Sequence, residues 1–198
     1  RLWAVLEAEG KTLAALNATL FANKLSEQVT QSIIEARRHI AHKVVRTYCV
    51  AKGIAVAFNP IPIADLFAAA TLDVAMVVHL SRTYGLPLSH REAGTLVQVI
   101  AAQIVALIGT VWAINLVSSA LKATTGGLST VVTAGAQGAV AYYATYIVGR
   151  VAERYFAQGK SWQEGGPKRV VQDILDSVDR DSILTEARRD IRAHLRRS

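Results

Sequence analysis

Cysteine is almost absent from this 198-residue sequence, and Cys49 is its single example. A disulfide needs two cysteines and a cysteine-based metal site needs several, so the sequence excludes an internal disulfide and a metal site of that type. Cys49 is therefore interpreted as a packed, inert thiol. His39 and His42 are three residues apart, but no carboxylate or cysteine joins them. No metal site is predicted there.

Charge is also scarce and unevenly distributed. Charged residues make up 19% of the chain, against an average of about 25% for soluble domains. Residues 1–52 carry eight basic and four acidic side chains, residues 53–149 carry three of each, and residues 150–198 carry eleven and eight. Basic flanks would suit nucleic acid. The nearly uncharged middle favours a membrane, because an anionic lipid surface attracts basic flanks, so we expect lipid and no nucleic acid as a partner.

The motifs that hold nucleotides or perform catalysis are missing as well. The sequence has no Rossmann glycine pattern, no His-Glu-x-x-His motif and no nucleophile elbow. Gly159-Lys160-Ser161 resembles the end of a phosphate-binding loop, but Arg154 stands where the first glycine of that loop belongs. Ser161 and Glu164 fit a helix capping box better. We predict no enzymatic activity, catalytic residue, cofactor or metal within these residues.

Acidic residues are few in the middle segment, where Asp65 and Asp73 come first. Two aspartates can act in acid–base chemistry, but a structural interpretation is favoured, with Asp65 as a helix cap and Asp73 paired with Arg82 or Arg91. In a membrane an unpaired charge is costly, so Asp73 would then be a functional candidate. The intramembrane polar candidates for a conduction path are Asp73, Gln98 and Gln103.

Proline is rare, and two of the four prolines, Pro60 and Pro62, stand one residue apart. Each removes a backbone donor and pushes the residue before it towards extended geometry. Asp65 stands where an N-cap residue belongs, and Gly85 suits the C′ position after the following apolar helix. The stretch is predicted as helix, proline break and helix, with Pro60, Pro62 and Asp65 as a structural elbow.

This stretch resembles a known family, domain-of-unknown-function family 697. It is the YcjF-type membrane domain that follows an Era-like GTPase domain in many bacterial proteins. The segment from Glu9 to Ala18 is similar to the helix after the G domain in cyanobacterial versions. The resemblance implies a helical membrane domain without catalytic residues and a GTPase domain N-terminal to Arg1 in the full-length chain. The matching residues are Pro60, Pro62, Asp65, Met76, Leu80, Tyr84 and Gly85.

Two long uncharged runs follow. The first, from Ala93 to Leu121, has 29 residues, and the second, from Ala123 to Gly149, has 27. A helix of the first length extends about 43 Å at about 1.5 Å per residue, more than the hydrocarbon core of roughly 30 Å. Ser89 and Glu92 fit a capping box that starts the first helix. We predict a transmembrane helical hairpin, with a buried hairpin of a soluble all-α domain as the alternative.

Small residues in the second run predict close helix packing, at Ala134, Gly135, Gly138 and Ala139. A neighbouring chain or the first run could fill the groove that they leave. Heptad-like leucines before residue 25 predict either a short coiled-coil arm or a helix that packs on its own domain. A homo-oligomer or a membrane-protein partner is expected. Tyr142, Tyr143, Phe156 and neighbouring aromatic residues are predicted as an interfacial belt.

The flanks are predicted as amphipathic helices. Residues 28–52 place apolar side chains on one side and Arg38, Lys43 and Arg46 on the other, as membrane-surface candidates. Residues after 157 are predicted as a linker and basic amphipathic helices that end the chain. Apolar residues recur at helical spacing in this segment, as at Val170, Val171 and Ile174, and predict a helix with a narrow apolar side.

The predicted fold is therefore an all-α, membrane-associated helical domain. It comprises an arm (1–52), an apolar membrane domain (53–156) and a linker with C-terminal helices (157–198). The expected function is anchoring and oligomerisation of a GTPase-associated bacterial protein. A soluble stalk that reports nucleotide state and a channel element are the alternatives. The resemblance implies a bacterial inner or thylakoid membrane. The positive-inside rule places both ends in the cytoplasm and Lys122 across the membrane.

Overall fold

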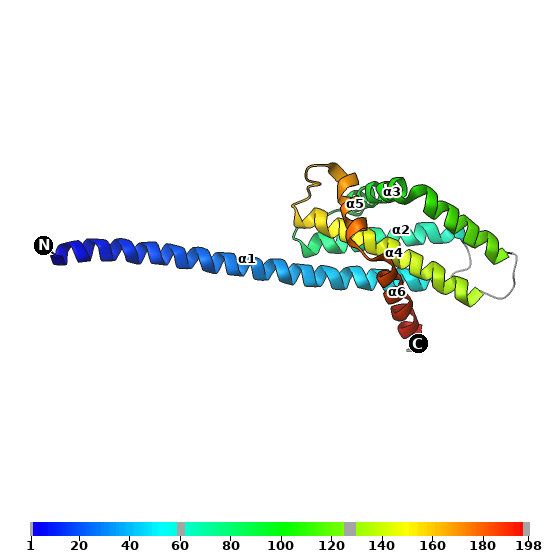
Figure 1. Cartoon of the computed structure of the whole chain (residues 1–198), viewed down its shortest axis with the longest axis horizontal. Coiled ribbons are helices and arrows are strands. Elements are labelled where there is room, and N and C mark those ends of the chain that lie inside the picture. Colours follow the sequence, from blue (N-terminus) through cyan, green and yellow to red (C-terminus); the bar gives the residue numbers. More distant parts are fainter. Residues whose placement is uncertain (1, 59–61, 125–129, 196–198) are drawn as a thin grey trace. The chain divides into compact units, whose positions relative to one another are not determined.

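Every regular element in the described part of the chain is an α-helix (Figure 1). The computed structural model describes the backbone of residues 2–58, 62–124 and 130–195, and the side chains of 14–57, 70–109 and 137–193 with some before residue 14. The predicted all-α class is thereby confirmed. The helices are α1 (Leu2–Phe58), α2 (Pro62–Thr83), α3 (His90–Thr124), α4 (Thr130–Ala157), α5 (Gly166–Ser177) and α6 (Arg180–Leu195).

The chain divides into two units, Arg1–Ile40 and Ala41–Ser198. The first consists of the N-terminal part of α1, and the side chains described in it are exposed. The second holds the end of α1 and all of α2 to α6. Ala41, Val45 and Cys49 of α1 are buried there, so the compact unit begins inside the segment that the sequence assigns to the arm.

The proline elbow separates two helices, as predicted, since α1 ends at Phe58 and α2 begins at Pro62. Pro60 lies outside the described residues. The predicted N-cap role of Asp65 is wrong in position, because Asp65 is the fourth residue of α2 rather than the residue before it. Proline has the fixed φ of a helix and needs no donor in the first turn, so Pro62 starts the helix earlier.

The turn between α2 and α3 follows the predicted signals. Gly85 has a φ of 71°, and the Leu86 N–H donates to the Ser81 carbonyl at 2.8 Å, which is a Schellman ending with glycine at C′. The Ser89 N–H donates to Glu92 at 2.8 Å, and the Glu92 N–H donates to the Ser89 hydroxyl at 3.3 Å. This is the predicted capping box.

Helix α4 is the centre of the second unit, where it packs against α2, α3, α5 and α6. Tyr142, Tyr143 and Phe156 of α4 are 1%, 6% and 1% exposed. These three aromatic side chains belong to the core, so their predicted place in an interfacial belt is wrong. A helix that is surrounded by neighbours buries apolar residues on all sides, and the sequence pattern alone resembles that of a membrane span.

The end of α1 crosses α4 at very close range. A Cβ atom built on Gly138 would lie 2.5 Å from the Gly53 carbonyl oxygen, and one built on Gly149 would lie 2.7 Å from the Val45 methyl groups. The two helices therefore run antiparallel, with glycine allowing the backbones to approach. Gly138 is covered within one chain, by Gly53 and Ala57 of α1 and by Ile191 of α6, and Ala139 beside it is buried. The predicted filling of this groove by the first uncharged run or by a neighbouring chain is wrong for Gly138. The surroundings of Ala134 and Gly135 lie outside the described side chains.

The C-terminal helices cover this core. Val170, Val171 and Ile174 of α5 are buried, as are Ala187 and Ile191 of α6. The Asp179 carboxylate accepts the Asp181 N–H at 3.1 Å at the start of α6. The predicted apolar sides of both helices are confirmed. The predicted capping box at Ser161 is wrong, because α5 begins at Gly166 and the Ser161 hydroxyl accepts the Gln163 N–H in a turn.

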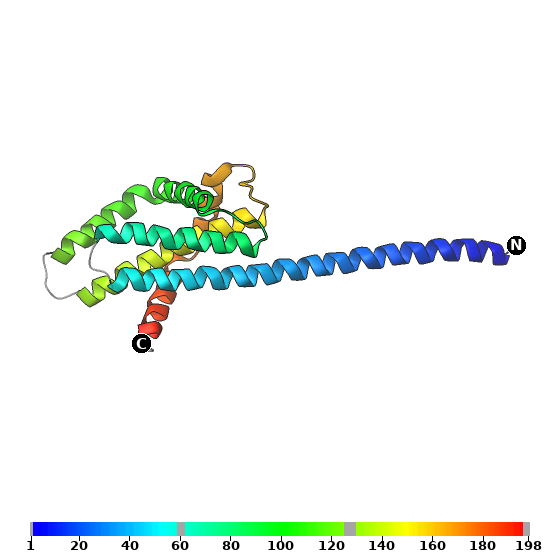
Figure 2. The same ribbon diagram turned by 180° about the vertical axis from the view of Figure 1, so that it is seen from behind.

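One end of the second unit gathers four helix ends. Figure 1 and the reverse view in Figure 2 show the C-terminal ends of α1 and α3 beside the N-terminal ends of α2 and α4. In sequence these four ends carry few charges: residues 53–64 and 93–121 have none, while Asp65 lies in the first turn of α2 and Lys122 in the last turn of α3. The opposite end holds the α2–α3 turn and the C-terminal end of α4. We call these two ends the apolar end and the polar end.

Gly138→Ala tests the close crossing. Alanine is favoured over glycine in a helix by about 1 kcal/mol, but its Cβ would meet the Gly53 carbonyl oxygen at 2.5 Å. We expect a net loss of about 1–3 kcal/mol of unfolding free energy through overpacking, measured by thermal unfolding in mild detergent. Gly109→Ala is the matched control, since nothing lies within 4 Å of a Cβ built there. Equal stability of the two variants would contradict the crossing.

Candidate functional site

A buried ion pair joins three helices in the second unit. The Lys52 ammonium of α1 lies 2.6 Å from an Asp73 carboxylate oxygen of α2. The Thr145 hydroxyl of α4 donates to the other Asp73 oxygen at 2.9 Å. Lys52 and Asp73 are 7% and 6% exposed. Each charge therefore has its compensation inside the protein, where an uncompensated charge would be costly.

Asp73 thus has an internal partner, as predicted, but the predicted partners Arg82 and Arg91 are wrong. Lys52 lies 21 residues before Asp73 in the chain, beyond the proline elbow, and α1 and α2 bring them together. One turn before Lys52, the Cys49 thiol is fully buried. Burial, reinforced by the nearby Asp73 carboxylate, raises the pKa of this thiol. Cys49 is therefore held as a neutral, packed thiol.

The three polar candidates for a conduction path do not share one surface. Asp73 is enclosed by Lys52 and Thr145 in the core, Gln98 is exposed on α3, and Gln103 is half-buried on that helix. A path through the protein needs polar groups that face a common space. The pairing of Asp73 removes it from such a role as an unpaired charge.

Arg46 connects α1 to α6. Its guanidinium donates from Nε and Nη2 to the two Asp190 oxygens at 2.9 and 2.8 Å, and Glu186 lies 3.7 Å away. The hydrogen bonds that Arg46 donates to Asp190, together with the negative charge of that carboxylate, raise the pKa of Arg46. A bidentate pair of this kind fixes the guanidinium plane. Arg46, Arg38 and Lys43 are all exposed, and Arg46 differs in being held by a carboxylate of α6.

A second polar cluster lies at the polar end. Arg150 of α4 pairs with Glu153 one turn later and meets His42 Nε2 of α1 at 2.7 Å. The Tyr84 hydroxyl donates to the other Glu153 oxygen at 3.4 Å. Further along α4, Arg154 pairs with Asp173 of α5 at 3.4 Å. Each arginine of α4 thus has an acidic partner.

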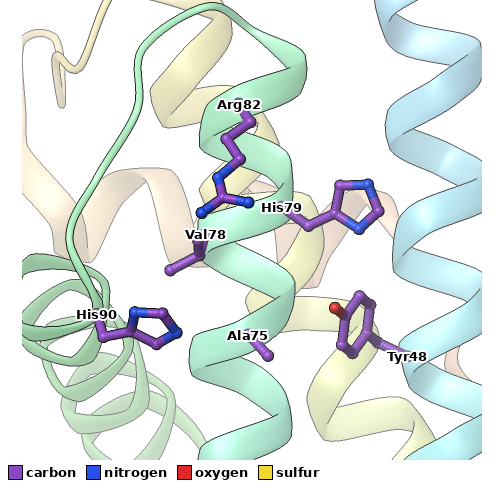
Figure 3. Close-up of a pocket in the computed structure, with 6 residues that line it drawn as sticks. All are labelled: Tyr48, Ala75, Val78, His79, Arg82 and His90. Atoms are coloured by element: carbon purple, nitrogen blue, oxygen red, sulfur yellow. The ribbon is translucent and has the colours of Figure 1, made fainter.

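A basic pocket of about 290 Å³ opens between α1, α2 and α3. Figure 3 shows two imidazoles, a guanidinium and a phenol around it, from three different helices. The Tyr48 and His79 rings meet edge-on at 6.2 Å. The sequence alone does not predict this pocket. His79 and Arg82 share a helix face by their spacing, but only the fold adds the rest. Its lining residues are Tyr48, Ala75, Val78, His79, Arg82 and His90.

Two kinds of site, a metal-binding cluster and a phosphate-binding loop, were compared with the geometry of the described residues. Within that part of the chain, no group of three His, Cys, Asp or Glu side chains is arranged to hold a metal ion. Gly159 and Lys160, which resemble a phosphate-binding loop in sequence, have φ angles of 69° and 66°. They form a tight turn after α4, six or more residues before α5 begins at Gly166. A phosphate-binding loop would lead directly into the helix.

The buried pair predicts a non-additive effect of substitution. Asp73→Leu leaves the Lys52 ammonium buried without a carboxylate, and the expected loss of unfolding free energy is about 3–5 kcal/mol. Adding Lys52→Met should restore most of it, because an apolar pair can replace a buried ion pair at little cost. A double-mutant cycle in unfolding experiments measures this coupling. Additive losses would show that the two groups do not stabilise each other.

Comparison with known proteins gives one assignment. The family model described as "Domain of unknown function (DUF697)" matches residues 20–180. Searches of curated proteins and of solved structures found no match. The matched range contains the proline elbow, the Lys52–Asp73 pair, the basic pocket and most of the helical bundle. The chain belongs to the DUF697 family.

Proposed function

We propose that this DUF697 domain anchors its protein in a membrane through the apolar end of the second unit. The observation that carries the proposal is the surface of α3. His90–Gly109 has the length and the mean hydropathy, 1.6, of a membrane span, and 22% of it is buried within the protein. Among the helices whose side chains are described, this is the one candidate span.

The first exposed residues of α3, up to Gln98, are polar, and beyond Gln98 the exposed residues described on this helix are apolar. Val105 is 67% exposed, and Ala101, Ala102 and Ala106 are exposed beside it. A helix that packs on a soluble core normally turns charged or polar residues to water. Here the sequence offers none after Glu92 until Lys122, apart from a few amides and hydroxyls. Lipid is a suitable neighbour for such a surface.

The arrangement of charge along the second unit supports the same proposal. Within α1 to α4, residues 53–64 and 93–121 carry no charge in sequence, whereas Arg150, Glu153 and Arg154 lie near the C-terminal end of α4, which belongs to the polar end. Helix α6 is the exception, because Ile191 packs near Gly53 and Gly138 and its neighbours Arg188, Arg189 and Arg192 are exposed. Lys52 and Asp73 neutralise each other in the interior of the unit. Paired charges of opposite sign that face the bundle interior are the form in which ionised groups occur at membrane depth.

Each of the two alternative functions, the soluble stalk and the channel element, requires a specific structural feature. A soluble stalk would need a protein partner over the exposed α3 surface, since an apolar surface of this kind rarely faces water alone. A channel element would need a polar path that excludes the sealed Asp73 pair. The membrane proposal also predicts a topology, with both chain ends in the cytoplasm and Lys122 on the other side of the membrane. Labelling of the new cysteine in a Lys122→Cys, Cys49→Ala variant, in sealed vesicles, shows on which side residue 122 lies.

Oligomerisation has support from the first unit. Six large apolar side chains of the arm are 46% to 70% exposed: Leu16, Leu20, Phe21, Leu25, Val29 and Ile33. We propose that a second copy of the arm covers part of them as a coiled coil, consistent with the heptad-like leucines. The GTPase association implied by family resemblance is part of the same proposal, and the activity would belong to a domain N-terminal to Arg1.

Val105→Arg tests membrane insertion. In the uncharged run from Ala93 to Leu121, Val105 is near the centre and Thr95 is near the start. An arginine near the centre of a span costs about 2.5–3.5 kcal/mol of insertion free energy, so the Val105 variant should be released from membranes by carbonate more readily than the wild type. Thr95→Arg is the control, because it lies near the start of the span, where a long side chain reaches the interface. Release of the wild type itself by carbonate would reject anchoring and favour the soluble stalk.

Leu16→Glu with Leu20→Glu tests the arm. Two charges in an apolar seam should disrupt a coiled coil and reduce the particle mass measured by light scattering in mild detergent. The paired control, Ser26→Glu with Thr30→Glu, adds the same charges at exposed polar positions. An unchanged mass in the leucine variant would remove the arm as the oligomerising element.

A further inference from the structure

We propose that the basic pocket between α1, α2 and α3 binds a phosphate group, with Arg82 as its main ligand. His79, His90 and Tyr48 complete the polar lining. Ala75 and Val78 are its apolar lining residues. None of the lining residues is acidic, so the pocket offers donors and positive charge to an anion without a competing carboxylate.

Three other arginines of this bundle differ from Arg82 because each forms an ion pair with an acidic side chain. Arg46 is paired with Asp190, Arg150 with Glu153, and Arg154 with Asp173. Within the described part of the chain, no acidic side chain forms an ion pair with Arg82, although Arg82 lines a pocket. A guanidinium in a concave site without a protein carboxylate is suited to an external anion. A planar guanidinium binds two oxygens of one phosphate at once.

The geometry brings additional donors to the same space. In Figure 3 the Arg82 guanidinium extends along α2 between His79 and His90, and the Tyr48 phenol approaches from α1. His90 is the first residue of α3, so the positive end of the helix dipole adds to the field. The Glu92 carboxylate in that first turn is held by the Ser89 N–H and hydroxyl, at 2.8 and 2.7 Å, and does not line the pocket.

The volume of about 290 Å³ suits a phosphate group with part of the molecule that carries it. This is the lower end of small-molecule pockets, roughly 300–1,000 Å³. Two sources share that chemistry: a soluble phosphate ester and the headgroup of an anionic phospholipid. His90 begins the candidate span, so the pocket would lie at the depth of lipid headgroups. The lipid source, but not the pocket itself, rests on the proposed membrane insertion.

Calorimetric titration of the full chain in phosphate-free neutral detergent tests the proposal. The probes are inorganic phosphate and a short-chain, monomeric phosphatidic acid. Arg82→Gln should weaken the binding of the preferred probe about tenfold or more, as expected for loss of a charged hydrogen bond. His90→Gln should weaken it less. Arg91→Gln removes the same charge from the neighbouring exposed position outside the pocket and should leave binding unchanged.

The outcomes separate the sources. Binding of the lipid alone, sensitive to Arg82→Gln, assigns the pocket to headgroups, and Arg82-dependent binding of inorganic phosphate assigns it to soluble phosphate esters. Equal weakening by Arg82→Gln and Arg91→Gln, or no binding of either probe to a chain whose thermal unfolding is normal, overturns the proposal. If carbonate releases the wild-type chain, anchoring fails, while the inorganic phosphate titration in detergent-free buffer still decides the pocket.

Discussion

The close crossing of α1 and α4 is the constraint on which the second unit depends. Gly53 and Gly138 meet backbone to backbone, and this contact sets how near α1 can lie to the central helix. The distance in turn allows the Lys52 ammonium beside Gly53 to reach Asp73, and the Thr145 hydroxyl to reach the same carboxylate. Larger side chains at the crossing would separate these polar groups and leave charges buried without partners. The glycines and the ion pair therefore support each other.

The sequence predicts the local features of this fold well, because each has a local physical cause. Paired prolines separate α1 from α2, glycine in the left-handed region ends α2, and a capping box starts α3. Asp65 is the exception, since Pro62 competes with it for the helix start and begins the helix first. Local signals decide where helices are, within a few residues, when no second signal competes.

The pairing between distant residues could not be predicted in the same way. Nothing in the sequence indicates that Asp73 meets Lys52 rather than Arg82, since the choice depends on how α1 lies against α2. The aromatic residues of α4 illustrate the same difficulty, because an apolar helix at the centre of a bundle and one in lipid have similar composition. The basic pocket was missed for this reason too: its four polar residues come from three helices.

The distribution of partners among the charged residues now separates structure from function. Three arginines form ion pairs with carboxylates. The pairs of Arg46 and Arg154 connect two helices, and the pair of Arg150 lies within one turn of α4. Lys52 and Asp73 do the same in the core. These paired groups have structural roles, because a ligand could bind them only by replacing an ion pair that already exists within the protein. Arg82 lines a pocket whose lining residues include no carboxylate, at the end of the bundle where the apolar surface of α3 begins. A domain held in lipid by that surface would bring this pocket to the headgroup layer, where phosphate is the most abundant anionic group.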